Sequence, residues 1–107
     1  MSMAKLNTDN FEAIIINAGK PAVLDFGAGW CAPCKKIEPI LEELSEEYGD
    51  QAVFGKVDID NYPDIAAQFN VMSVPTVIFL KNGEEQDRII GLEKKPKIVK
   101  RLEAILG

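Results

Sequence analysis

Histidine is absent from this sequence of 107 residues, and only two cysteines and one tryptophan are present. The absence of histidine excludes Ser-His-Asp hydrolysis, Cys-His proteolysis, haem with a histidine ligand and most zinc enzymes. Two cysteines without a histidine also leave a structural zinc ion short of its four usual ligands. We therefore expect no metal site, and any chemistry must come from thiols, carboxylates, lysines or backbone groups.

Long apolar runs and clusters of positive charge are also missing. The longest apolar stretch covers residues 74–80 and is broken by Pro75, whereas a membrane span needs ~18–20 residues. The formal net charge is −5 and the lysines are scattered, which disfavours a nucleic-acid binder. Residues 1–6 are followed directly by Asn-Thr-Asp-Asn, so the apolar region of a signal peptide does not follow them. We expect a cytoplasmic protein without membrane or nucleic-acid partners.

The composition is that of an ordinary globular protein, with 47% hydrophobic and 27% charged residues. A chain of this length forms one core, and no repeat, low-complexity run or Ser/Gly-rich linker divides it. We therefore predict a single domain over residues 1–107.

Strand-like and helix-like patterns alternate along the chain. Strands are predicted at 22–26, 52–59, 76–80 and 87–90, with a further short strand near 4–6. Helices are predicted at about 9–19, 34–48, 63–69 and from Lys95 onward, and Asp9 and Glu12 have the spacing of an N-cap and its box partner. The Asn-Gly pair at 82–83 predicts a hairpin. Strands joined through helices run parallel, so the fold class is α/β, with a central mixed β-sheet flanked by helices.

The motif with the clearest chemistry is Trp-Cys-Ala-Pro-Cys at residues 30–34, between a buried strand and a helix. Its spacing places Cys31 at the helix start, where unpaired backbone N–H groups and the helix dipole stabilise a thiolate. Cys34 falls within the first turn, close enough to form a disulfide with Cys31. Dithiol exchange requires a thiolate that attacks a disulfide and a second thiol that displaces it.

Other interpretations of the two cysteines were compared with redox chemistry. A structural disulfide closing so short a loop contributes only about 2 kcal/mol, and it is unusual in a cytosolic chain. An iron–sulfur cluster shared between two chains has enough thiolates, but nothing in the sequence signals such a dimer. A redox function is the favoured interpretation of a Cys-x-x-Cys motif beside a βαβ pattern.

Beyond this motif, the sequence resembles the thioredoxin family along essentially its whole length. The resemblance rests on landmarks that occur in order: residues 23–26 (Val-Leu-Asp-Phe), 30–35, Pro39, 56–60 (Lys-Val-Asp-Ile-Asp), 74–76 (Val-Pro-Thr), 79–83 and Gly91. It implies a thioredoxin-like fold with the dithiol exposed at one edge, protein disulfide reductase activity and no bound cofactor. Two positions depart from the pattern: Ala32 stands where the motif usually has glycine, and Gly27 where an aromatic residue usually follows Asp-Phe.

The resemblance implies roles for four residues at the site. Cys31 attacks the target, and Cys34 resolves the mixed disulfide, leaving a Cys31–Cys34 disulfide. Asp25 accepts the proton of Cys34, and Lys56 pairs with this acid and tunes it. From the sequence alone, an acid in an apolar strand has a raised pKa. The alternatives are a tolerated polar residue at a strand end for Asp25 and an exposed strand charge for Lys56.

The resemblance also implies a substrate-binding surface and partners. A cis proline beside the dithiol leaves the preceding backbone free to pair with an extended substrate. Expected partners are disulfide-containing target proteins and a separate thioredoxin reductase, NADPH- or ferredoxin-linked, with the protein itself a monomer. The alternatives for Trp30 and Gly91 are an exposed aromatic and a plain turn residue. The expected substrate-binding residues are Trp30, Ala32, Pro33, Val74, Pro75, Ile90, Gly91 and Leu92.

Two rival functions remain open on this fold. A dedicated oxidant or isomerase uses the same dithiol but needs a much less reducing potential. A binding subunit docks onto a partner, and its dithiol is incidental.

Overall fold

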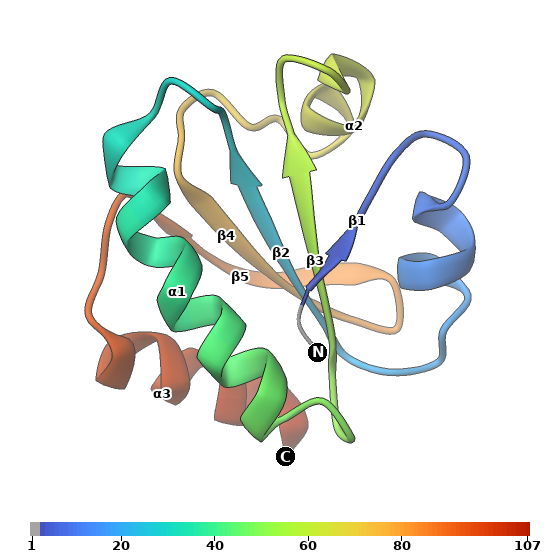
Figure 1. The fold of residues 1–107 in the computed structure, drawn as a ribbon. Helices are drawn as coiled ribbons and strands as arrows, with labels where there is room; N and C mark the ends of the chain where they lie inside the picture. The colour runs from blue at the N-terminus through green and yellow to red at the C-terminus, as the bar shows by residue number, and fades with distance from the viewer. Residues whose placement is uncertain (1–2) are drawn as a thin grey trace.

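The computed structural model describes residues 3–107, which form a five-stranded sheet with helices packed on both faces (Figure 1). The strands are β1 (Ala4–Lys5), β2 (Ala22–Gly27), β3 (Val53–Asp58), β4 (Thr76–Lys81) and β5 (Glu84–Ile90). The helices are η1 (Glu12–Ile16), α1 (Ala32–Glu47), α2 (Pro63–Gln68) and α3 (Lys95–Leu106). The predicted α/β class, with a central sheet flanked by helices, is confirmed.

The sheet has the strand order β1-β3-β2-β4-β5. β1, β3 and β2 run parallel, whereas β4 is antiparallel to β2 and β5 is antiparallel to β4. The mixed sheet is therefore confirmed. Asn82 and Gly83 have φ values of 55° and 79°, the backbone that a two-residue hairpin turn requires. Pairing begins directly after this turn, so β5 starts at Glu84 and is longer than predicted.

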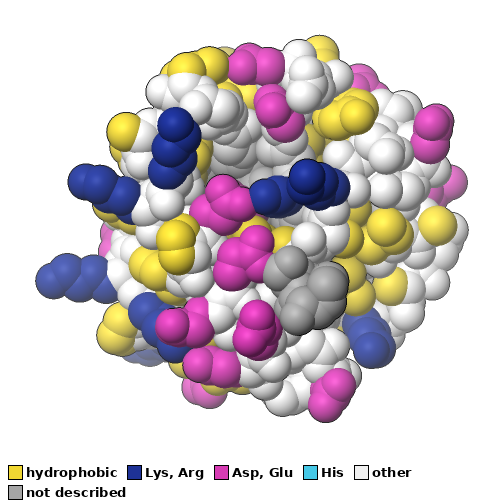
Figure 2. All heavy atoms as spheres, in the orientation of Figure 1, with side chains coloured by type: hydrophobic (Ala, Val, Ile, Leu, Met, Phe, Trp, Pro, Cys, Tyr) yellow, Lys and Arg dark blue, Asp and Glu magenta, His cyan; other side chains and the backbone are white. Residues whose placement is uncertain are grey.

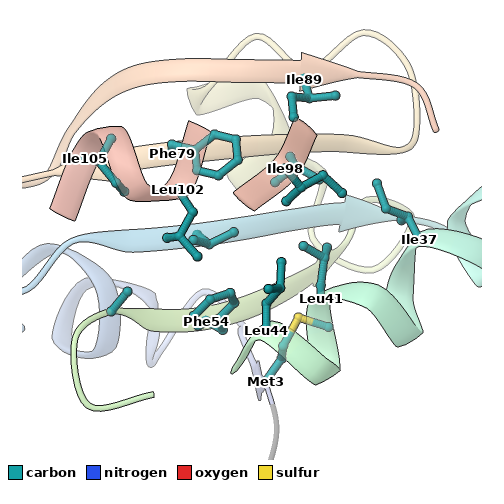
Figure 3. Packing of buried hydrophobic residues seen from close by; sticks show 13 residues of the cluster. Met3, Ile37, Leu41, Leu44, Phe54, Phe79, Ile89, Ile98, Leu102 and Ile105 are labelled. Atoms are coloured by element: carbon teal, nitrogen blue, oxygen red, sulfur yellow. The ribbon is translucent and has the colours of Figure 1, made fainter. Parts of the chain in front are cut away.

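The side chains of β2 point alternately to the two faces of the sheet, and each face carries its own hydrophobic core. Val23 packs with residues of α1 and α3, and Leu24 and Phe26 pack on the opposite face with residues of η1 and α2. The first core is shown in Figure 3, where Leu41 and Leu44 of α1 approach the sheet from the same side as α3. Asp25 alternates with Leu24 and Phe26, so its side chain lies on the face covered by α1.

The first helical segment differs from its prediction. η1 is a short π-helix over Glu12–Ile16, and Asp9 does not cap it. Asn7 instead caps the turn that precedes η1, since its Oδ1 accepts hydrogen bonds from the backbone N–H groups of Asp9 and Asn10 at 2.9 and 2.8 Å. Asn and Asp are equally good caps, so the sequence pattern alone did not distinguish the two positions.

Candidate active site

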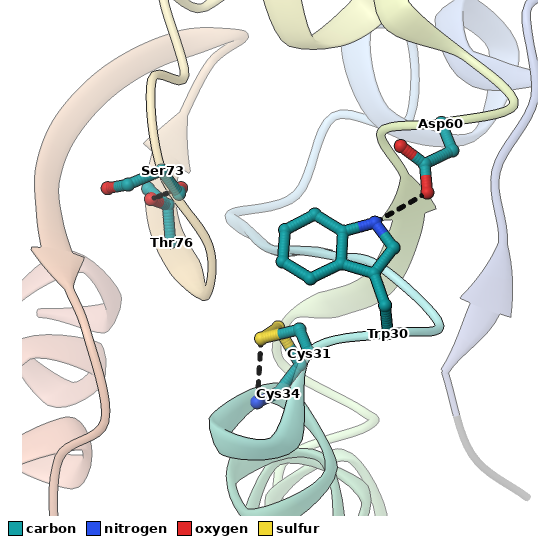
Figure 4. The surroundings of a disulfide bond; sticks show 6 residues. All are labelled: Trp30, Cys31, Cys34, Asp60, Ser73 and Thr76. Atoms are coloured by element: carbon teal, nitrogen blue, oxygen red, sulfur yellow. Dashed lines mark hydrogen bonds between the residues drawn. A yellow bond between two sulfur atoms is a disulfide. The ribbon is translucent and has the colours of Figure 1, made fainter.

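The two cysteines lie where the chain leaves β2 and enters α1, at one edge of the sheet (Figure 4). Cys31 is the N-cap of α1, with φ −95° and ψ 110°, and Pro33 occupies the first turn. Proline is well suited to this turn because its missing N–H has no helical partner to lose. The sequence therefore folds locally so that both sulfur atoms meet at the start of a 16-residue helix.

Cys31 and Cys34 are joined by a disulfide, with their Cα atoms 5.3 Å apart. The backbone N–H of Cys34 donates a hydrogen bond to the Sγ atom of Cys31 at 3.2 Å. This donor is one of the unpaired N–H groups of the first helical turn. It favours negative charge on the Cys31 sulfur, as does the positive end of the helix dipole.

Both cysteines are buried in this oxidised form, in contrast to the exposed dithiol that the resemblance implied, and burial does not distinguish them. Cys31 is 4% exposed and Cys34 is 7% exposed. The neighbouring Trp30 is instead 70% exposed, and its Nε1–H donates to the Asp60 carboxylate at 2.8 Å (Figure 4). Sequence analysis assigned no role to Asp60. It lies thirty positions from Trp30, and no local pattern joins the two.

Asp25 is buried beneath this site, with 5% of its surface exposed and, in the described part of the chain, no hydrogen-bond partner for Oδ1. Burial raises the pKa of Asp25 to about 7, with Glu38 and, more weakly, Glu42 adding to the rise and Lys56 opposing it. The raised pKa expected from the sequence is therefore found. Its physical cause is mainly desolvation of the carboxylate, which disfavours the charged form.

Lys56 does not pair with Asp25 as the resemblance implied. The two residues are partners in the parallel register of β2 and β3, but the Lys56 ammonium forms its ion pair with the Glu38 carboxylate of α1 at 2.5 Å. This bond raises the pKa of Lys56. Glu38 is thus a site residue that sequence reasoning missed, because the helix-to-strand contact joins positions eighteen apart.

A cleft of about 590 Å³ connects these groups to the surface. Its wall brings Asp25, Cys34, Glu38 and Lys56 together with Gly27. A Cβ atom at Gly27 would lie 3.4 Å from both Cβ and Sγ of Cys34. A large side chain at position 27 would therefore contact Cys34 from its first carbon atom onward, and glycine leaves that side of the dithiol open.

The expected substrate-binding surface is divided between exposed and buried residues. The Val74–Pro75 bond is cis, and Pro75 itself is buried. The N–H of Gly91 donates to the carbonyl of Pro75 at 2.8 Å, which places the two segments side by side. Met72, 93% exposed, lies just before this proline and was missed. Exposed apolar surface comes from Trp30, Ala32, Pro33, Ile90 and Leu92, while Val74 and Gly91 are half-buried.

Charge on the molecule is unevenly distributed around the site. Figure 2 shows acidic side chains gathered over the region that α1 occupies in Figure 1. They belong to the outward face of α1, whose sequence carries glutamates at 38, 42, 43, 46 and 47.

No helix within residues 3–107 is long and apolar enough to cross a membrane.

Comparison with known proteins gives one consistent family. The family model described as Thioredoxin matches residues 2–104. A protein named Thioredoxin from Staphylococcus haemolyticus is 41% identical over 103 residues, which cover 96% of this chain and 97% of the relative. Thioredoxin 2 of Chlorobaculum tepidum is 38% identical over 98 residues, covering 92% and 90%. The Bifunctional thioredoxin reductase/thioredoxin of Mycobacterium leprae is 36% identical over 97 residues, covering 91% of this chain and 21% of the relative.

Proposed function

The chain belongs to the thioredoxin family, and from this premise we propose how its residues carry out disulfide exchange. The protein is a protein-disulfide oxidoreductase with a redox-active cysteine pair. Members of the family act on disulfide-containing targets and are recycled by a thioredoxin reductase. The observation that carries the proposal is the position of Cys31, whose sulfur caps α1 and accepts a hydrogen bond from the N–H of Cys34.

In the first step, the Cys31 thiolate of the reduced protein attacks one sulfur of the target disulfide. A bond forms between Cys31 and that sulfur, and the second target sulfur leaves as a thiolate. The helix N-terminus supports this assignment because it stabilises the thiolate at neutral pH.

In the second step, Cys34 transfers its proton to the Asp25 carboxylate, and the resulting thiolate attacks Sγ of Cys31. The bond between Cys31 and the target breaks, and the target's remaining sulfur leaves as a thiolate. Two electrons have passed to the target, and the Cys31–Cys34 disulfide has formed. A base with a pKa of about 7 suits this step, because it is partly ionised at neutral pH and still accepts a proton readily.

The exposed apolar residues around the dithiol dock the target in this proposal. Trp30, Ala32, Pro33, Ile90, Gly91 and Leu92 form the docking surface. The backbone of Val74, before the cis bond to Pro75, pairs with an extended segment of the target. Main-chain pairing gives affinity without demanding one target sequence, which suits a protein with many targets.

We further propose that a separate reductase, NADPH- or ferredoxin-linked, returns the disulfide to the dithiol. The fused relative from Mycobacterium leprae, whose name joins both activities, supports a reductase of this class. The remaining parts of the proposal are a single domain over residues 1–107, a monomeric state and a cytoplasmic location. Reduction of the oxidised protein by each purified reductase, sedimentation analysis and cell fractionation test them.

Reduction of insulin disulfides with dithiothreitol as electron source tests the central proposal. The wild-type protein should accelerate precipitation of the insulin B chain, and Cys31→Ser should be inactive. An incidental dithiol, as in a binding subunit, predicts no acceleration by the wild type over dithiothreitol alone. That result would reject the mechanism proposed here.

A further inference from the structure

The carboxylates of Asp25 and Glu38 and the ammonium of Lys56 line the same cleft and act on one another. Lys56 is the register partner of Asp25 across β2 and β3, and partners in a parallel pair have their side chains on the same face. Its ammonium is nevertheless bonded to Glu38 of α1 at 2.5 Å. Asp25 Oδ1 is buried and has no hydrogen-bond partner within residues 3–107. Lys56, the register partner of the buried Asp25, is thus ion-paired with Glu38 instead.

We propose that Glu38 is a positioning residue for the resolving step, because its carboxylate holds the Lys56 ammonium on α1 and so keeps it from pairing with Asp25. The inference deepens the proposed function and rests on it for the role of Asp25. Glu38 does not touch the reacting sulfur atoms in this scheme. It acts through Lys56 and through its own negative charge at the cleft.

The position of Glu38 makes this competition physically reasonable. Its side chain is 37% exposed and that of Lys56 is 31% exposed, so the pair forms at the cleft wall without complete desolvation of either charge. Pairing with Asp25, which is 5% exposed, requires the ammonium to enter a less hydrated environment. Desolvating an ion costs free energy that the new pair must offset. Glu38 therefore provides the less costly partner.

Several charged groups face Asp25 or line the cleft beside it. Among them, Glu38 is the acid bonded to the nearest cation, and it is also the charged group with the largest effect on the Asp25 pKa. Glu42, one helical turn further along α1, acts on Asp25 in the same direction but more weakly. The groups to be considered in any titration are Cys34, Lys35, Glu38 and Glu42 of α1, Lys56 and Asp58 of β3, Lys5 of β1, and Tyr62.

Titration of the Asp25 carboxyl carbon by NMR in the oxidised protein tests the proposal. Both cysteines are then in the disulfide, so neither thiol titrates alongside Asp25. Glu38→Gln should lower the Asp25 pKa by about 1 unit or more, because one negative charge is lost and the released ammonium can approach. Glu42→Gln is the matched control: it removes the same charge from the same helix, and no hydrogen bond joins Glu42 to Lys56 among the described residues.

A double-mutant cycle separates the two ways in which Glu38 acts. If Glu38 works by holding Lys56, the shift caused by Glu38→Gln should be clearly smaller in a Lys56→Met background. An equal shift in both backgrounds means that Glu38 acts only as a nearby charge, and this outcome overturns the proposal. A shift no larger than that of Glu42→Gln overturns it as well.

The pH dependence of insulin reduction separates the role of Glu38 from the role of Asp25 as proton acceptor. The rate of insulin reduction against pH should show an inflection near pH 7 that moves to lower pH in Glu38→Gln and is lost in Asp25→Asn. An unchanged profile in Asp25→Asn contradicts the role of Asp25 as proton acceptor, whereas the NMR cycle still decides whether Glu38 holds Lys56. An unshifted profile in Glu38→Gln, with the Asp25→Asn effect present, counts against Glu38 alone.

Discussion

Cys31 and Cys34 are three residues apart and almost equally buried, yet their backbone environments differ. The sulfur of Cys31 accepts the N–H of Cys34 at the N-cap of α1, while Cys34 lies inside the helix against the cleft. A hydrogen bond to sulfur and the helix dipole both favour the thiolate. We therefore expect the two thiols to differ in reactivity through hydrogen bonding and the helix dipole, with little contribution from exposure.

In the reduced protein, we expect iodoacetamide at pH 6–7 to alkylate Cys31 first. Cys34→Ser should retain targets as mixed disulfides, because no second thiol is present to resolve them. Peptide mapping by mass spectrometry identifies the labelled residue, and the matched control is Cys31→Ser, which should trap nothing. Preferential labelling of Cys34 would reverse the assignment of attacking and resolving thiols.

The buried acid gives a second prediction for a single residue. Burial raises the pKa of Asp25 to about 7, whereas an aspartate in an unfolded chain titrates near ~3.9. The folded state therefore binds the proton more tightly, and its contribution to stability is complete below about pH 4 and lost as the pH rises through about 7. Asp25→Asn cannot ionise, so it should match the wild type near pH 4.

Above pH 8, the same variant should be more stable than the wild type by up to about 4 kcal/mol, which is the free-energy equivalent of the pKa change. Urea unfolding of the oxidised proteins at pH 4, 6 and 8 measures the difference. A stability gap that does not widen with pH would show that Asp25 is not a desolvated acid in the folded protein.

Among the elements, β1 is the shortest strand, and a close side-chain contact accompanies its pairing with β3. Ala4 and Lys5 pair with Gly55 and Lys56 of β3, and the N–H of Leu6 donates to the carbonyl of Lys56 at 2.9 Å. The Leu6 side chain packs directly over Gly55, where an added Cβ atom would lie 2.6 Å from Leu6 Cδ1. Glycine at this position lets β1 dock onto the sheet.

Gly55→Ala should therefore destabilise the protein by about 1–3 kcal/mol, because Leu6 is buried and has little room to move. The control is Gly29→Ala, whose Cβ atom would meet nothing within 4 Å; it should change the free energy of unfolding by less than about 0.5 kcal/mol. Urea melts compare the two. Equal stability of both variants would mean that β1 is not held by the Leu6 contact.

At the scale of the whole molecule, the redox potential distinguishes a reductase from an oxidant or isomerase on the same fold. Ala32 is the first residue of α1 and is exposed, and we expect both redox forms to keep it helical. Its restricted backbone, relative to glycine, is worth about 0.4–1 kcal/mol and acts mainly on less ordered states. Most of this effect cancels between the oxidised and reduced proteins.

Ala32→Gly should therefore shift the potential by less than about 20 mV, since ~30 mV corresponds to about 1.4 kcal/mol for a two-electron couple. The wild type should lie near the ~−270 mV typical of thioredoxin. Titration against glutathione or dithiothreitol measures both proteins. A wild-type potential of about −180 mV or higher would instead identify an oxidant or isomerase.

Features that depend on short-range patterns could be predicted from the amino-acid sequence. The short apolar run at residues 22–26 indicated a buried strand, Asn82 and Gly83 indicated the hairpin, and the Cys31–Cys34 spacing placed both thiols at a helix start. All of these follow from local backbone preferences and from the periodicity of apolar residues. The α/β fold class could be predicted from the sequence for the same reason.

Contacts between side chains of different elements could not be predicted from the sequence and became visible only in the folded protein. Lys56 has Asp25 beside it in the sheet but bonds to Glu38 of the helix packed above, and Trp30 bonds to Asp60. Such pairings depend on how α1 and the loops lie on the sheet, and sequence separation carries no information about this. The buried acid was visible in the sequence; the charges that set its proton affinity required the packed fold.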